Sequence, residues 1–77
     1  MSTKITWVNG CFDVLHIGHI KLFQKAWELG NPVVVGIDGD DRIRQAKGND
    51  RPINSIHDRI GFLKSIKYIK EAIPNTL

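Results

Sequence analysis

Cysteine is nearly absent from this 77-residue chain, which contains one, Cys11. A single cysteine cannot close an intramolecular disulfide or build a cysteine-rich zinc site, so disulfide-stapled secreted scaffolds and zinc modules of that kind are excluded. No apolar run approaches the roughly 20 residues of a membrane-spanning helix. The first residues, Met1 to Ile5, lack the hydrophobic region of a signal peptide. We therefore expect a cytoplasmic protein with no membrane partner.

The charge excess is small: 11 Lys and Arg against 8 Asp and Glu give +3, in an ordinary globular composition with 42% hydrophobic residues. Much of the basic charge falls in one central stretch, at Arg42, Arg44, Lys47, Arg51 and Arg59. Such a patch suits an anionic ligand, although a solvated basic face would have the same composition. Nucleic acid is not the expected partner, because the basic residues are not interleaved with surface aromatic residues.

The hydrophobic pattern predicts a strand, a helix and a second strand in the first half of the chain. β-branched and aromatic residues fill 4–8, and apolar residues recur at helical spacing over 17–29, with Gly30 as the stop signal. The apolar run 33–37 is typical of a strand in a parallel sheet. Together these segments form a βαβ unit with a right-handed crossover.

The second half of the chain is expected to continue the same single domain, which spans 1–77. The pattern predicts about one helical turn at 42–46, an irregular loop at 47–54 and a helix with Ser55 as its N-cap. A third strand is expected to begin at 72–73. The fold class is therefore α/β, built on a parallel sheet.

Residues 9–19 join the end of the first strand to the first helix, where open α/β sheets bind ligands. His16 and His19 are three residues apart, so on a helix they point the same way and continue the buried stripe that includes Phe23. Gly18 leaves room for a ligand to approach the backbone. Two imidazoles at a helix N-terminus can donate hydrogen bonds to phosphate oxygens, so the segment predicts a phosphate site.

Other interpretations of these residues remain open at this point. A histidine pair at this spacing can be purely structural. Asp13, His16 and His19 could also bind a transition metal, although no fourth ligand is in view. The Walker loop and the G-x-G-x-x-G fingerprint are both absent, so phosphate binding would use neither.

Two motifs resemble the signature of the cytidylyltransferase-like nucleotidylyltransferases: Gly10-Cys11-Phe12-Asp13 with His16-Ile17-Gly18-His19, and later Lys47-Gly48-x-x-Arg51-Pro52-Ile53 with Arg59. The resemblance runs over about residues 4–74. It is strongest to the heptose 1-phosphate adenylyltransferase domain and to glycerol-3-phosphate cytidylyltransferase. His-Ile-Gly-His also occurs in class I aminoacyl-tRNA synthetases, but those enzymes are several times longer and carry a lysine-rich motif that this chain lacks.

The resemblance implies a Rossmann-like parallel sheet between two helical layers (α/β/α), stopping here after the third strand. It implies transfer of a nucleotidyl group from ATP or CTP to a phosphorylated sugar or polyol, with release of pyrophosphate. Nucleotide contacts would come from Cys11, Phe12, His16, His19 and Arg59. The two histidines would also stabilise the transition state, and Lys47 would hold the phosphate of the acceptor or of the nucleotide as a further catalytic residue.

The resemblance also implies supporting residues and partners. Gly18 would support the site, Asp13 would organise its loop or contact magnesium indirectly, and Asp40 would cap the turn after the second strand. Mg²⁺ is expected to arrive on the nucleotide phosphates, with no metal site of its own. Relatives are longer, so we expect a sheet edge near 70–74 that a second copy or a complementing C-terminal half would cover. The alternative function is a non-catalytic nucleotide- or phosphate-binding module, or an interaction subunit.

Overall fold

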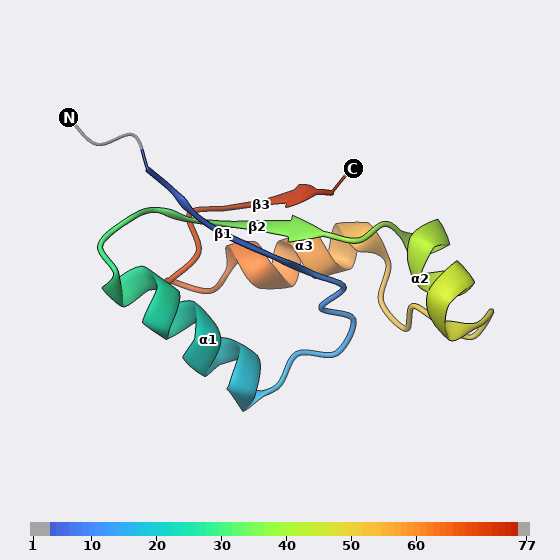
Figure 1. Ribbon diagram of the computed structural model, residues 1–77. Helices are drawn as coiled ribbons and strands as arrows, with labels where there is room; N and C mark the ends of the chain where they lie inside the picture. The colour runs from blue at the N-terminus through green and yellow to red at the C-terminus, as the bar shows by residue number, and fades with distance from the viewer. Residues whose placement is uncertain (1–3, 76–77) are drawn as a thin grey trace.

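The computed structural model describes residues 4–75, and its elements follow the predicted order (Figure 1). In chain order they are β1 (Thr6–Gly10), α1 (Ile17–Glu28), β2 (Val33–Ile37), α2 (Asp40–Lys47), α3 (Ile56–Lys64) and β3 (Glu71–Pro74).

The three strands form one parallel sheet in the order β1-β2-β3, so β2 is central and both β1 and β3 are edges of the described sheet. Thr6 of β1 pairs with Val33 of β2, and the register continues in parallel to the ends of both strands. Val33, Val35 and Ile37 are at most 1% exposed. The central position of β2 explains its continuous apolar sequence. The expected edge near 70–74 is confirmed, because β3 pairs with β2 alone among the described strands.

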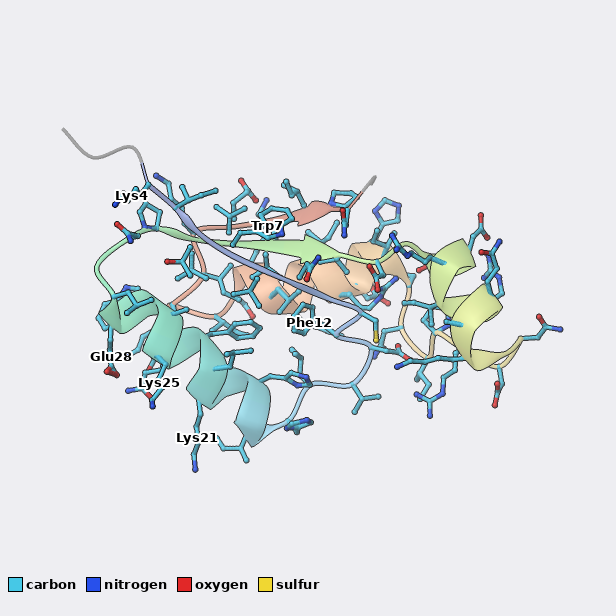
Figure 2. All side chains as sticks on the ribbon, in the orientation of Figure 1. Lys4, Trp7, Phe12, Lys21, Lys25 and Glu28 are labelled. Carbon is cyan, nitrogen blue, oxygen red and sulfur yellow. The ribbon has the colours of Figure 1, made fainter. Side chains whose placement is uncertain are left out.

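Both α1 and α3 lie on one face of the sheet, below it in Figure 1. Phe23 of α1 and Leu63 of α3 are fully buried in a single core cluster with the β2 side chains. Because both crossovers progress the same way across the sheet with the same hand, their helices must share a face. Lys21, Lys25 and Glu28 project from the side of α1 that is turned away from the core (Figure 2).

The described residues contain one of the two helical layers that the resemblance implies. On the opposite face of the sheet, Trp7 and Ile73 are 45% and 39% exposed. The Trp7 ring lies across Gly36, where a Cβ atom would fall 2.4 Å from Trp7 Cζ2. Part of β2 is thus covered by an aromatic ring on this face. The predicted Rossmann-like parallel sheet is confirmed for three strands, with a single helical layer in residues 4–75.

Two of the predicted element bounds are wrong. The first strand is 6–10 and not 4–8, because Asn9 and Gly10 remain paired with β2. The second helix has eight residues, 40–47, and not about one turn. Ile43 is its only buried residue, so the sequence shows almost no hydrophobic period there. Acidic residues in its first turn and basic residues in its last turn match the helix dipole, which favours the longer helix.

Two predicted helix boundaries are confirmed. The Ser55 hydroxyl accepts a hydrogen bond from the backbone N–H of Asp58 at 3.3 Å and caps α3. Gly30, with φ of 90°, follows the end of α1, where a left-handed residue commonly terminates a helix. α1 is the longest helix at 12 residues. Within residues 4–75, no helix has the length and apolar character needed to cross a membrane.

Candidate functional site

A pocket of about 190 Å³ lies where β1 ends and α1 begins. Its walls combine two imidazoles, two cations, a thiol and a carboxylate, from Cys11, Phe12, Asp13, Val14, His16, His19, Lys47 and Arg51. The position lies beyond the carboxyl end of a parallel strand and beside the N–H groups of a helix N-terminus, both of which favour anionic ligands. The fold thus gathers the predicted contacts, Arg59 excepted, around one pocket.

Larger hollows occur elsewhere on the molecule, including one of about 460 Å³ beside Trp27 and Tyr68. That hollow and two others, of about 560 and 440 Å³ along α1, have no histidine in their walls. Volume alone therefore does not identify the site. The smaller pocket is distinguished by its hydrogen-bond donors and cations.

The two histidines form a reciprocal cap at the start of α1. His16 is the N-cap residue, and its Nδ1 accepts the backbone N–H of Gly18 at 3.0 Å. The backbone N–H of His16 in turn donates to Nδ1 of His19 at 3.1 Å. Because both Nδ1 atoms are acceptors, each neutral imidazole carries its proton on Nε2. The pair therefore offers two Nε2–H donors whose tautomers are set by the helix.

The position of His16 differs from the prediction. It was expected on the buried stripe of the helix, but as the N-cap residue it is exposed, while His19 is half-buried. Their ring centroids are nevertheless 4.0 Å apart. Gly18 supports this arrangement, because a Cβ there would fall 2.8 Å from Cε1 of His16. The absent side chain therefore makes room for the His16 ring.

The pKa of His19 lies below its ordinary value. Burial has the larger effect, since it disfavours the charged imidazolium, and a positive charge on the adjacent His16 disfavours it further. His19 is therefore neutral at pH 7. This protonation state is the one that its hydrogen bond from the His16 backbone requires.

Phe12 forms the floor of the pocket. It is 7% exposed and packs against Phe23 in the core, with ring centroids 5.5 Å apart. Its ring also meets His19 edge-on at 5.4 Å. Figure 2 shows it between the end of β1 and α1. Its φ of 51° is in the left-handed region that an aromatic residue rarely adopts, and backbone strain of this kind is concentrated at functional sites.

The cations of the pocket come from the end of α2 and the loop that follows it. Lys47 Nζ lies 3.4 Å from Sγ of Cys11, so the ammonium group reaches the segment after β1. Arg51, whose side chain is 40% exposed, lines the same pocket and lies 3.5 Å from the Asp13 carboxylate. Arg51 was not among the predicted site residues, although its four-residue spacing from Lys47 in the second motif was a signal for it.

Asp13 organises the loop between α2 and α3. Its carboxylate accepts the backbone N–H groups of Ile53 and Asn54, each at 2.8 Å, and the Asn54 side chain donates to the Asp13 carbonyl at 2.7 Å. Burial raises the pKa of Asp13, but the hydrogen bonds from Asn54, Ile53 and Arg51 outweigh it and leave the pKa below its usual value. The carboxylate oxygens are occupied, and residues 4–75 contain no group of three or more His, Cys, Asp or Glu placed to hold a metal ion.

Arg59 does not line the pocket. Its side chain is 0% exposed, and its guanidinium group bonds to other parts of the protein. Asp40 also differs from the prediction, because the N-cap of α2 is Gly39 and no side chain caps it. The Asp40 carboxylate accepts a hydrogen bond from Arg59 instead. As placed here, Arg59 presents no surface to a nucleotide.

Residues 7–77 match the cytidylyltransferase-like family. The bifunctional protein HldE of a Nitratiruptor species is 47% identical over 66 residues, which make up 86% of this chain and 14% of that protein. HldE of Haemophilus influenzae (strain PittEE) is 38% identical over 73 residues, or 95% of this chain and 15% of that protein. The chain thus spans only a small part of these curated relatives.

Among solved structures, the lipopolysaccharide core biosynthesis protein from Thermoplasma volcanium GSS1 superposes with a TM-score of 0.80 at 30% sequence identity. The match covers 91% of this chain and 56% of that one. The shared architecture therefore extends over almost all of this chain and about half of the neighbour.

Proposed function

The chain belongs to the cytidylyltransferase-like family, and from this premise we propose that its pocket serves nucleotidyl transfer. The donor is ATP or CTP, the acceptor is a phosphorylated sugar or polyol, and pyrophosphate is released. The structural neighbour's role in lipopolysaccharide core biosynthesis supports an acceptor derived from a sugar. The proposed substrates are intracellular metabolites, so the proposed location is the cytoplasm.

The observation that best supports this proposal is the pair of hydrogen bonds that the two Nδ1 atoms accept. With both Nδ1 atoms accepting hydrogen bonds, the two Nε2–H groups are donors whatever ligand is present. Lys47 and Arg51 add two positive charges to the same pocket. Fixed donors and cations at the N-terminus of a helix stabilise charge that develops on phosphate oxygens.

In the proposed reaction, an oxygen of the acceptor's phosphate attacks the α-phosphorus of the nucleotide. The bond from the α-phosphorus to the bridging oxygen breaks, and its electron pair leaves with pyrophosphate. The attacking oxygen is already anionic, so no base has to remove a proton. His16 and His19 donate to the α-phosphate, and Lys47 neutralises the acceptor or nucleotide phosphate. Mg²⁺ is proposed to enter with the nucleotide and to neutralise further charge on its phosphates.

The pocket volume limits what this chain binds alone. Sites that enclose a small molecule usually measure about 300–1,000 Å³, whereas this pocket measures about 190 Å³. It has room for phosphate groups but does not enclose a whole nucleotide. We therefore propose that a second copy or a complementing polypeptide completes the site for turnover. A phosphate-binding module without turnover is the second candidate, and the small pocket is the observation that favours it.

Two measurements distinguish these candidates. Calorimetric titration with Mg-ATP and Mg-CTP reports binding, and pyrophosphate release in the presence of heptose 1-phosphate or glycerol 3-phosphate reports transfer. Lys47→Ala is expected to weaken nucleotide binding by about tenfold or more, because it removes a charge-assisted contact. The matched variant Lys21→Ala, on the outer side of α1, should bind within about twofold of wild type.

Nucleotide binding with pyrophosphate release, by the chain alone or once a complementing polypeptide is added, supports the transferase. Nucleotide binding without release under both conditions supports the module. If the chain binds neither nucleotide, or if both lysine variants bind as wild type does, the proposed function is wrong.

A further inference from the structure

Arg59 is a fully buried arginine that the proposed reaction does not use. Its guanidinium makes four hydrogen bonds: Nε donates to the carbonyl of Asn54 at 3.1 Å, and one terminal nitrogen donates to the carbonyls of Cys11 and Asp38 at 2.8 and 2.6 Å. The other terminal nitrogen donates to the Asp40 carboxylate at 2.5 Å. Four of its five N–H groups therefore have protein partners.

The partners of Arg59 belong to the segments that build the pocket. Cys11 lies in the loop after β1, Asp38 follows β2, Asp40 begins α2, and Asn54 ends the loop that carries Arg51. The relative positions of these segments depend on groups that bridge them. Arg59 is such a bridge, because its rigid planar fork fixes the directions of all its hydrogen bonds at once.

Lys47 and Arg51 lie on parts of the chain that are held at both ends by this network. α2 runs from Asp40 to Lys47, a rise of about 10 Å for a rigid helix, so the Arg59–Asp40 ion pair determines where Lys47 lies. On the other side, Asn54 is bound both by Arg59 and by Asp13. The network therefore sets the distance between the cations and the loop that precedes the histidines.

We propose that Arg59, paired with Asp40, is a positioning residue that holds the cations of the pocket against its histidine side and does not contact the nucleotide. The inference rests on the proposed nucleotide site but concerns a residue outside its wall. A lysine cannot replace this arginine, since one ammonium group cannot satisfy acceptors that lie in four directions of a planar fork.

The sign of an affinity change tests the proposal. Asp40→Asn removes a negative charge near bound phosphates, so charge alone would tighten nucleotide binding. The positioning role predicts the opposite result, a loss of about tenfold in affinity for Mg-ATP. Without the Asp40 carboxylate, Lys47 and Arg51 shift relative to the histidines, and small displacements of charged groups weaken their contacts with phosphate. The matched variant Asp41→Asn removes the same charge from the next residue, which pairs with exposed Arg44, and should bind as tightly as wild type or more tightly.

Coupling to Lys47 provides a second test. In an Arg59→Lys background, Lys47→Ala should cost at least fivefold less affinity than in wild type, since Lys47 is already displaced; independent phosphate contacts would be additive. If either variant fails to fold, an NMR titration of the ¹⁵N-labelled wild-type protein tests whether Arg59 contacts the nucleotide. The Arg59 Nε–H signal should keep its chemical shift on titration with Mg-ATP, whereas a shift comparable to that of the His19 signals would overturn the proposal.

The positioning role of Arg59 can also be tested without a nucleotide, so its failure can be distinguished from failure of the proposed function. If no nucleotide binds, Asp40→Asn should still shift the backbone amide signals of 47–54, while Asp41→Asn leaves those of 51–54 unchanged. Equal shifts in the two variants would contradict the positioning role even without a ligand.

Discussion

The backbone N–H of His16 donates to Nδ1 of His19 at 3.1 Å, and the side chain of His16 accepts from the helix that His19 belongs to. Each imidazole is thus a helix cap on its Nδ1 side and a free donor on its Nε2 side. Stability and the proposed phosphate binding use different nitrogens of the same ring, so substitutions can separate them.

Asn and Ala at position 16 should separate the two roles. The Asn side chain is a good N-cap acceptor, so His16→Asn should keep α1 within about 0.5 kcal/mol of wild type, whereas His16→Ala should lose about 1 kcal/mol. Neither variant supplies the Nε2–H donor, so both should lose at least about 100-fold in turnover of the completed site. Thermal unfolding and pyrophosphate release measure the two effects. Full activity of His16→Asn would contradict the proposed donor role.

Stability should fall in mildly acidic solution because of His19. Its native pKa is below the ordinary value of 6.5, so below that pH the unfolded chain binds more protons than the native protein. The contribution to the free energy of unfolding is therefore complete above about pH 6.5 and is lost as the pH falls through the native pKa. Denaturant unfolding at several pH values between about 5 and 8 measures it. His19→Gln cannot be protonated, so the part of the pH dependence that comes from His19 should disappear in that variant.

Glycine-to-alanine substitutions should affect α1 and α3 differently. A Cβ at Gly18 would fall 2.8 and 2.9 Å from two atoms of the His16 ring, whereas a Cβ at Gly61 would meet no atom within 4 Å. Gly61→Ala should therefore stabilise the protein by about 0.5–1 kcal/mol, the ordinary helix gain. Gly18→Ala should offset that gain by displacing the His16 cap, and it should weaken Mg-ATP binding about tenfold, because the donor moves with the ring. Equal effects of the two substitutions on binding would show that the position of the His16 ring is unimportant.

Elements determined by local sequence could be predicted. The spacing of apolar residues in α1, the apolar run of β2, the Gly30 stop and the Ser55 cap all depend on neighbours within a few residues. α2 was predicted too short because its stability comes from charges at its ends and from the Asp40–Arg59 ion pair, which no hydrophobic period reveals.

The role of Arg59 could not be read from local pattern, because its acceptors lie at positions 11, 38, 40 and 54. One signal did exist. Arg59 follows Ile56 by three residues and precedes Leu63 by four, so it occupies the buried stripe of α3. A charged residue at a buried position requires partners, and the nearby acidic residues were the candidates. The family pattern pointed instead to a ligand contact.

Removing the charged carboxylate of Asp13 should lower the free energy of unfolding. Asp13 is 3% exposed, and its carboxylate accepts two backbone N–H groups. Asn has a single acceptor oxygen, so Asp13→Asn leaves one of these buried donors facing an NH₂ group, which should cost about 1–3 kcal/mol. Asp50→Asn is the matched control on the exposed loop and should change stability by less than about 0.5 kcal/mol.

The pH profile of the same variant provides an independent check. Because the native pKa of Asp13 is below its ordinary value of 3.8, its contribution is complete above that pH and is lost as the pH falls through the native pKa. Denaturant titrations between about pH 2 and 6 should therefore show a smaller acid loss for Asp13→Asn than for wild type or Asp50→Asn. If Asp13→Asn kept the full acid dependence, the hydrogen bonds to Ile53 and Asn54 would not be what holds this loop in place.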